Sequence, residues 1–98
     1  MNDLAISKAL ALAIGWDDED LCVCGSYLDV RYFKDGWPWR RFDYRDWNVI
    51  GPIAERYDCF PYQNAAGNWV AAYHRFGAIA CETPQEAIAQ YVIEKAKR

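Results

Sequence analysis

The chain has 98 residues, of which 53% are apolar and 26% are charged, and this composition excludes a disordered chain. The length predicts one globular domain over 1–98, because two shorter domains would each be too small to sustain a core. The net charge of −3 argues against a dedicated binder of duplex nucleic acid, whose phosphate contacts come from Lys and Arg.

The beginning of the chain, MNDLAISKALALAIGW, contains an apolar run but no targeting signal. The run lacks a basic region before it and carries Lys8 within it, so we expect no signal peptide. No stretch approaches the ~18 uninterrupted apolar residues of a membrane helix, so we expect no membrane contact. These features predict a cytoplasmic protein whose four cysteines are thiols.

The first predicted element is a helix over 3–14, because apolar side chains recur there at the spacing of one buried helix face. The residues of this face are Ile6, Leu10, Ala13 and Ile14. Asn2 or Asp3 can cap the start of the helix, and Gly15 suits the left-handed position after its end. Four consecutive acidic residues then break the helical pattern.

A strand is predicted over 27–33, since YLDVRYF alternates apolar with charged side chains as a half-buried strand does. The next stretch, DGWPWRRFDYRDW at 35–47, interleaves aromatic and arginine side chains. We interpret it as a connection, because Pro38 forbids a helix across it and Gly36 supplies a turn.

A second helix is predicted to begin at the N-cap Asp46. Its buried face comprises Trp47, Ile50, Ile53, Ala54 and Tyr57. The dipeptide Gly51-Pro52 lies within this helix, and it predicts a kink or an irregular first turn.

Three short strands are predicted over 59–63, 68–74 and 78–81. The connection at 64–67, NAAG, is a hairpin-type turn with glycine at its end. Short turns between successive strands indicate antiparallel pairing.

The clearest predicted element is a helix over 83–96. Its first residues, TPQE, form a capping box with proline at the first helical position. Its buried stripe comprises Ile88, Tyr91 and Val92. The predicted fold is therefore α+β: a small antiparallel sheet of three to four strands sandwiched by helices, in the order α-β-α-β-β-β-α.

Four segments together carry a resemblance to a known family. They are AIGW at 13–16, FDYRDWNVIGPIAERYD at 42–58, GNWVAAYH at 67–74 and ETPQEAIAQYVIEKA at 82–96. With them the chain resembles the phage ABA sandwich domain family, a set of small proteins encoded by bacteriophages and prophages. The resemblance implies a sheet with helices on both faces and a phage-borne accessory protein, and it brings no catalytic motif. Residues 21–34 are fuller than the family pattern, which predicts added sheet or surface there.

The four cysteines do not have the spacing of a zinc site, which places its ligands in pairs on turns. Only Cys22 and Cys24 are close in sequence, and in an extended segment we expect them to alternate between faces. Cys59 and Cys81 occur in apolar runs, where a free cysteine is a common core residue. We therefore expect no metal and no cofactor.

No catalytic arrangement stands out. His74 is the only histidine, and no Ser or Cys beside it forms a recognised nucleophile pair. No phosphate-binding glycine motif occurs either, so we expect no enzymatic activity. Two rival hypotheses remain: a virion structural or assembly accessory protein, and a small enzyme or ligand-binding protein with a pocket near Tyr73 and His74.

Two stretches are candidates for binding a partner. The acidic run Asp17, Asp18, Glu19 and Asp20 is either a solvated loop or a contact surface for a basic partner. The WPWRR stretch contributes Trp37, Trp39, Arg40 and Arg41. Aromatic side chains beside Arg are typical of interface hot spots and of single-stranded nucleic-acid platforms, and packing within the molecule explains them equally well.

These features favour a non-enzymatic, phage-derived binding protein. Its most specific form is an inhibitor of a bacterial defence complex, such as an anti-CRISPR protein. The acidic run would contact the Lys and Arg that normally hold nucleic acid, while WPWRR would anchor a second contact. The expected partner is therefore a host protein or ribonucleoprotein complex.

Overall fold

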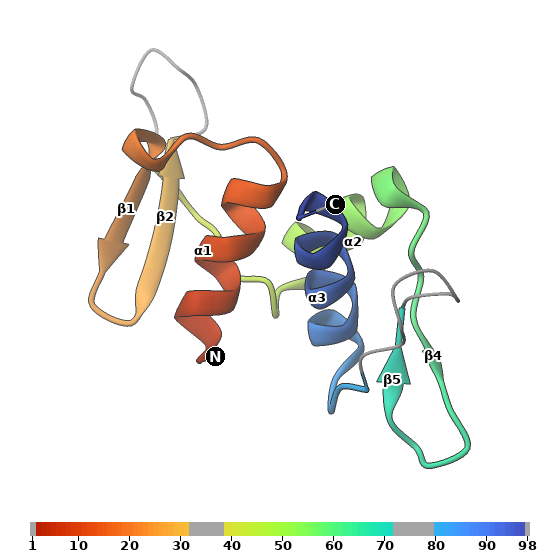
Figure 1. The fold of residues 1–98 in the computed structure, drawn as a ribbon. Coiled ribbons are helices and arrows are strands. Elements are labelled where there is room, and N and C mark those ends of the chain that lie inside the picture. Colours follow the sequence, from red (N-terminus) through yellow and green to blue (C-terminus); the bar gives the residue numbers. More distant parts are fainter. Residues whose placement is uncertain (1, 32–38, 72–79, 98) are drawn as a thin grey trace.

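The structure is a computed structural model that describes residues 2–31, 39–71 and 80–97. In these ranges the chain forms three α-helices, a three-stranded antiparallel sheet and a two-stranded antiparallel sheet (Figure 1). The fold class is therefore α+β, as predicted, and the elements follow roughly the predicted order. The molecule is elongated, with extents of 45 × 25 × 21 Å.

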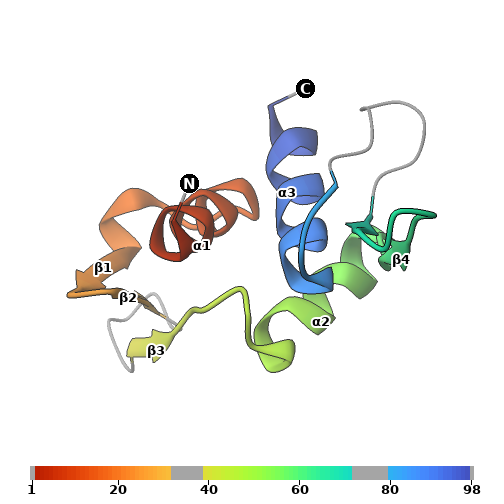
Figure 2. The same cartoon turned by 90° about the horizontal axis from the view of Figure 1, so that it is seen from below.

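The helices occupy the middle of the molecule, and the two sheets lie at its opposite ends (Figure 1 and Figure 2). The prediction placed all the strands in one sheet between helices, so the arrangement differs in this respect. The cause is the segment at 42–46, which carries the chain from the first sheet across to the second helix. The later strands consequently pair with one another at the far end.

The first helix, α1 (Asp3–Ala13), confirms the predicted element and is one residue shorter. Asn2 caps it, because the Asn2 side chain accepts a hydrogen bond from the Ala5 amide at 2.8 Å. Ile6 and Leu10 are buried as predicted. Gly15 follows the helix with a φ of +110°, a backbone conformation that favours glycine.

The three-stranded sheet consists of β1 (Leu21–Cys24), β2 (Tyr27–Arg31) and β3 (Trp39–Arg41), in the order β1-β2-β3. The strand predicted over 27–33 is confirmed as β2 where the structure describes it. β1 and β3 were not predicted as strands: β1 buries almost nothing, and β3 lies in the stretch interpreted as a connection. Both owe their conformation to pairing with β2 rather than to an alternating pattern of their own.

The inner face of this sheet packs on α1. Leu28 and Val30 of β2 are buried in the core that this face shares with α1, and Phe42, which is also buried, continues the inner side after β3. The Phe42 amide donates a hydrogen bond to the Leu28 carbonyl at 2.8 Å, which extends the pairing of β2 and β3. Alternation along β2 therefore points the side chains of Tyr27, Asp29 and Arg31 away from α1.

The second helix, α2 (Trp47–Tyr57), begins after the N-cap Asp46, whose side chain accepts from the Asn48 amide at 2.9 Å. The Asp46 carbonyl accepts from both the Val49 and Ile50 amides at 2.9 Å, so the first turn shares one acceptor between two donors. The helix continues through Pro52.

The expectation that Trp47 is a core residue is wrong. The Trp47 side chain is 51% exposed, whereas Ile50, Ile53 and Ala54 of the same helix are buried. Trp47 is the first residue of the helix, and helical side chains point back toward the N-terminus. Its indole therefore projects beyond the helix start and misses the core.

The second sheet pairs β4 (Tyr62–Gln63) with β5 (Trp69–Val70) across the predicted turn at 64–67. These strands are shorter than predicted: 59–61 is not strand, and the part of 68–74 beyond residue 71 lies outside the described residues. Of the predicted strand at 78–81, the described part contributes one antiparallel bridge between Cys81 and Trp69.

The last helix, α3 (Pro84–Ala96), confirms the predicted element and its cap. Thr83 Oγ1 accepts from the Glu86 amide at 3.2 Å. Ile88 and Val92 are buried, whereas Tyr91 is half-buried at the border of the core. α3 contacts both α1 and β5. None of the three helices in the described ranges has the length and apolar character needed to cross a membrane.

Candidate interaction surface

The side of the three-stranded sheet that faces away from α1 is the candidate functional site, and we call it the outer face. Its side chains are Cys22, Cys24, Tyr27, Asp29, Arg31, Trp39 and Arg41. Cross-strand partners share a face, and the register pairs Cys22 and Arg41 with Asp29, Cys24 with Tyr27, and Trp39 with Arg31. Figure 2 shows α1 on one side of this sheet and no described helix on the other.

Two arginines on the outer face are stacked on aromatic rings. The Arg41 guanidinium carbon lies 4.0 Å from the ring centroid of Tyr27, and Arg41 Nε lies 3.0 Å from Asp29 Oδ1. The Arg31 guanidinium carbon lies 5.3 Å from the ring of Trp39. Both distances are within the range of cation–π attraction. The rings stay accessible, with 48% of Tyr27 and 40% of Trp39 exposed.

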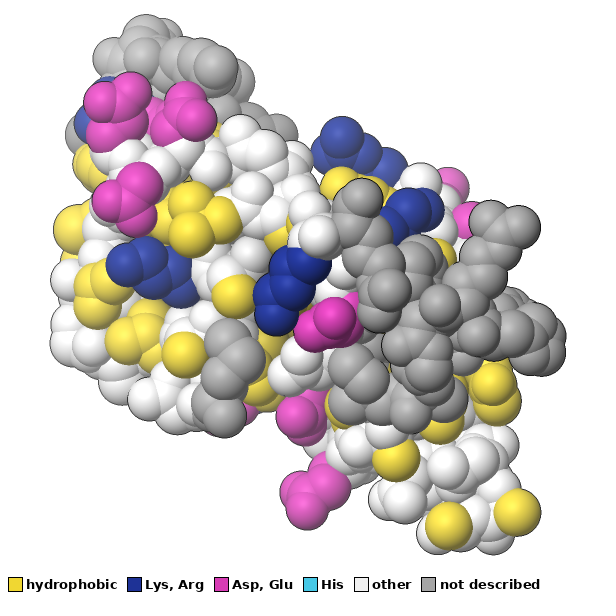
Figure 3. Space-filling model, viewed as in Figure 1, with side chains coloured by type: hydrophobic (Ala, Val, Ile, Leu, Met, Phe, Trp, Pro, Cys, Tyr) yellow, Lys and Arg dark blue, Asp and Glu magenta, His cyan; other side chains and the backbone are white. Residues whose placement is uncertain are grey.

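The acidic run lies beside this face. It forms a short 3-10 turn, η1 (Asp18–Asp20), that leads directly into β1. Asp17, Asp18 and Glu19 are exposed, and Figure 3 shows acidic side chains gathered at the end of the molecule where this turn lies. Within the described ranges, Asp18 Oδ1 forms an ion pair with Lys8 Nζ at 3.9 Å. Three of the four predicted acids are therefore available at the surface.

Asp20 is the exception, and its predicted role as an exposed partner contact is wrong. The residue is buried, and its Oδ1 lies 3.8 Å from Arg31 Nε. This distance is an ion pair but is too long for a hydrogen bond. Asp20 thus acts within the molecule: it holds Arg31, which in turn stacks on Trp39. Through this chain of contacts the acidic turn and the aromatic strand β3 lie at the same end of β2.

The predicted WPWRR anchor is divided by the sheet. Trp39 and Arg41 lie on the outer face, whereas Arg40 is paired with Val30 and points to the opposite side. There Arg40 lines an open groove of about 660 Å³ between β3 and α2, together with Val49 and Pro52. Trp37 lies outside the described residues.

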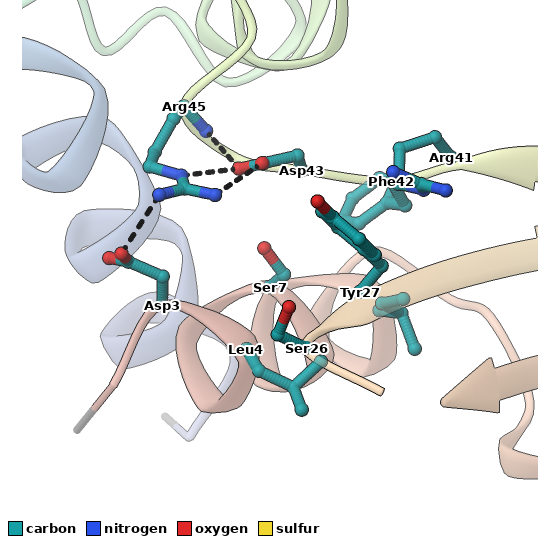
Figure 4. A pocket seen from close by; sticks show the side chains of 10 residues that line it. Asp3, Leu4, Ser7, Ser26, Tyr27, Arg41, Phe42, Asp43 and Arg45 are labelled. Carbon is teal, nitrogen blue, oxygen red and sulfur yellow. Dashed lines mark hydrogen bonds and ion pairs between the residues drawn. The ribbon is translucent and has the colours of Figure 1, made fainter. Parts of the chain in front are cut away.

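Tyr44 and Arg45 of the same stretch are structural. Tyr44 is buried, and its hydroxyl donates a hydrogen bond to Asp3 Oδ1 at 2.6 Å. Arg45 donates to Asp43 Oδ2 at 2.7 Å and to Asp3 Oδ2 at 3.0 Å (Figure 4). The Arg45 guanidinium lowers the pKa of Asp43, and burial together with Asp3 raises the pKa of Tyr44. These contacts tie α1 to the segment before α2.

A small cavity lies at this tie, and an open hollow of about 560 Å³ lies beside it, lined by Asn2, Gly25 and Ser26 among others. Asp3, Asp43 and Arg45 border the small cavity with the neighbouring end of the outer face at Tyr27 (Figure 4). Its volume is about 10 Å³, which admits one water molecule at most. The sequence offered Asp3 only as a helix cap, because a contact between residues 3 and 44 has no local signal.

The two cysteines of β1 correct another prediction. Cys22 and Cys24 do not alternate between faces: strand side chains repeat every two residues, so both lie on the outer face, with Sγ atoms 3.4 Å apart. Both are exposed. The hydrogen bond with Cys22 is the main cause that raises the pKa of Cys24, and its thiol also donates to Asp29 Oδ2 at 3.7 Å.

The other two cysteines are buried in the core, as predicted. Burial raises the pKa of Cys59 and of Cys81 to about 11. Within the described ranges, no three His, Cys, Asp or Glu side chains are arranged to hold a metal ion. Tyr73 and His74, where a ligand pocket was the rival hypothesis, lie outside the described residues.

Comparison of the chain with protein-family models, with curated proteins and with solved structures finds no significant match. The resemblance to the phage ABA sandwich domain therefore stays a prediction from the quoted segments.

Proposed function

We propose that the chain is a non-enzymatic binding protein that occupies a basic, nucleic-acid-binding surface of a bacterial protein or ribonucleoprotein complex. The observation that carries this proposal is the outer face, where exposed Tyr27 and Trp39 are held by stacked arginines beside the acidic turn. Pre-positioned aromatic and arginine side chains lose little freedom on binding, and such residues dominate interface energetics.

The acidic turn gives the proposal its partner chemistry. Asp17, Asp18 and Glu19 place three exposed carboxylates next to the aromatic face. Carboxylates attract the Lys and Arg side chains that would otherwise bind phosphates, and such charges mainly raise the rate of association. The aromatic rings would then limit dissociation.

The most specific form of the proposal is an inhibitor of a bacterial defence complex, of the anti-CRISPR kind, that acts in the cytoplasm of the host cell. The support for this form is the resemblance to the phage ABA sandwich domain together with the acidic, aromatic surface. In this form the chain would be carried by a phage or prophage.

The experiment is capture of bacterial proteins on the immobilised chain, with three bait proteins compared. The baits are the wild type, the acidic-turn variant Asp17→Asn/Asp18→Asn/Glu19→Gln, and the control variant Glu55→Gln/Asp58→Asn/Glu82→Gln. Each variant removes three exposed carboxylates, so net charge is matched and only position differs. We expect the wild type and the control to retain the same nucleic-acid-binding protein, and the acidic-turn variant to lose it.

Two further measurements make the test specific. Added nucleic acid should displace the captured protein, and Trp39→Ala should speed its dissociation by at least tenfold, the effect of about 1.4 kcal/mol. Equal loss of capture from both triple variants, or capture that nucleic acid does not affect, would contradict the proposal.

A further inference from the structure

Strand β1 forms one edge of the three-stranded sheet (Figure 1), and among the described residues only β2 pairs with it. Natural proteins protect such edges with charged side chains, proline or bulges, because unpaired backbone groups bind other strands. β1 has the sequence LCVC, without charge or proline, and its register with β2 is unbroken. The Val23 side chain is 51% exposed. β1 is therefore an edge that is open to pairing with another strand.

The hydrogen bonds of the sheet determine which backbone groups of β1 point outward. The Leu28 carbonyl accepts from the Phe42 amide at 2.8 Å, so the backbone of Leu28 faces β3. Val23 is the cross-strand partner of Leu28, and its N–H and C=O consequently point away from β2. The same alternation turns Leu21 outward, but its N–H already donates to the Asp18 carbonyl. The Leu21 C=O and both backbone groups of Val23 therefore remain open.

A second copy of β1 matches these groups in one register. Antiparallel pairing centred on Val23 lets each Val23 N–H donate to the Val23 C=O of the other copy. It also places Leu21 opposite Gly25 of the other copy. The Cys24 C=O faces β2, so the Gly25 N–H across the same trans peptide bond points outward and can donate to the Leu21 C=O. Pairing centred on Cys22 would instead bring the Val23 C=O to the occupied Leu21 N–H, so the open groups select the first register.

Side chains and charges also fit this register. The Val23 side chains of the two copies would lie side by side, and Leu21 would meet Gly25, which has no side chain. The two acidic turns would lie apart, each beside the hairpin turn of the other copy. That turn leads into Tyr27, on which the Arg41 guanidinium is stacked at 4.0 Å, so acidic groups approach a basic end. We propose that β1 pairs with β1 of a second copy, antiparallel and centred on Val23, in a two-fold symmetric dimer.

The dimer joins two three-stranded sheets into one continuous sheet, with both outer faces on the same side. It does not rest on the proposed function, because the pairing uses the edge of the sheet rather than the outer face. The register places Cys22 opposite Cys24 of the other copy in a non-hydrogen-bonded pair, where Cα atoms are about 4.5 Å apart. This separation is within the range of a disulfide, so the thiols can report the register.

The first test is sedimentation equilibrium of the reduced protein over a range of concentrations, with three variants of Val23. Val23→Pro removes the N–H that the dimer needs, and the β1–β2 hairpin keeps its bonds because this N–H points away from β2. Val23→Lys adds a charge to the edge, and Val23→Thr is the control that keeps the N–H and the branched side chain. We expect the wild type and the control to dimerise as the concentration is raised to about 1 mM, as weak interfaces do. The other two variants should associate at least tenfold more weakly.

The second test is oxidation by diamide, which takes two electrons and two protons from a pair of thiols as their S–S bond forms. We expect a mixture of Cys22→Ser and Cys24→Ser to give a covalent dimer on a non-reducing gel, and each variant alone to give at least fivefold less. Equal cross-linking in all three samples, or efficient cross-linking of Cys24→Ser alone, would overturn the register.

Two results of sedimentation would overturn the dimer itself. One is a wild type that stays monomeric at about 1 mM, above the range of specific weak interfaces. The other is dimerisation of Val23→Pro as strong as that of the wild type, with a circular dichroism spectrum that shows an intact fold. If Val23→Pro does not fold, Val23→Lys decides in its place.

Discussion

The hydrogen bond from Tyr44 to Asp3 provides the sharpest test of how the first helix is attached. Tyr44→Phe removes only the hydroxyl, and the ring position is 3% exposed, so the packing of the ring is retained. A hydrogen bond to a charged group contributes about 1.5–3 kcal/mol. Because the Asp3 side chain is 53% exposed and keeps Arg45 as a partner, water can replace the lost donor. We therefore expect a loss of about 1.5 kcal/mol, at the lower end of that range.

The measurement is urea unfolding of the wild type, Tyr44→Phe, Asp3→Asn and the double variant. If the two groups contact each other, the two losses should not add, with a coupling free energy of about 1 kcal/mol. Tyr57→Phe is the matched control, since in the described ranges the Tyr57 hydroxyl has no hydrogen bond, and it should change stability by less than about 0.5 kcal/mol. Losses that add to within about 0.3 kcal/mol would refute the contact as the attachment of α1.

Three further predictions concern the helices and the buried thiols. Thr83→Ala should lower the free energy of unfolding by about 1 kcal/mol through loss of the cap on Glu86, and Thr83→Ser should retain it. Trp47→Ala should lower the free energy of unfolding in urea by less than about 0.5 kcal/mol, because the side chain is exposed. A loss of about 3 kcal/mol or more would show that Trp47 is a core residue. The raised pKa of Cys59 and of Cys81, about 11 against 9.0 for the exposed group, favours neutral thiols in the fold. The stabilisation from these two neutral thiols is complete below pH 9 and is lost between pH 9 and 11, so the free energy of unfolding should fall over that interval. At pH 8, only the two exposed thiols of each chain should react rapidly with a disulfide reagent.

The elements that sequence predicted well are those with a local signal. The capping box TPQE predicts the last helix, and the alternation of Leu28 and Val30 with polar neighbours predicts β2. β1 and β3 lack such a pattern, because each gains its order from hydrogen bonds to β2. Trp47 shows the reverse error: its spacing fits the buried stripe of α2, yet its place at the helix start takes it out of the core.

The candidate site was predictable in its residue types more than in its geometry. The acidic run and the aromatic and arginine stretch were visible, but the sheet register decides which side each residue takes. That register separates Arg40 from Trp39 and Arg41, and it joins Cys22 to Cys24 on one face. Asp20 is not an exposed partner contact because it forms an ion pair with Arg31. The sequence gives no local signal for this contact between residues 20 and 31.

The contact between α1 and α3 has a consequence for how the chain reaches its fold. The apolar faces of these two helices, with Leu10 on one and Ile88 on the other, belong to one core, although they are the first and last elements of the chain. During synthesis, α1 emerges long before α3, and until then the three-stranded sheet and the segment that holds Tyr44 can cover only part of its apolar surface. The complete core can therefore form only after α3 has left the ribosome, and until then the side of α1 that packs on α3 is exposed to chaperones and proteases.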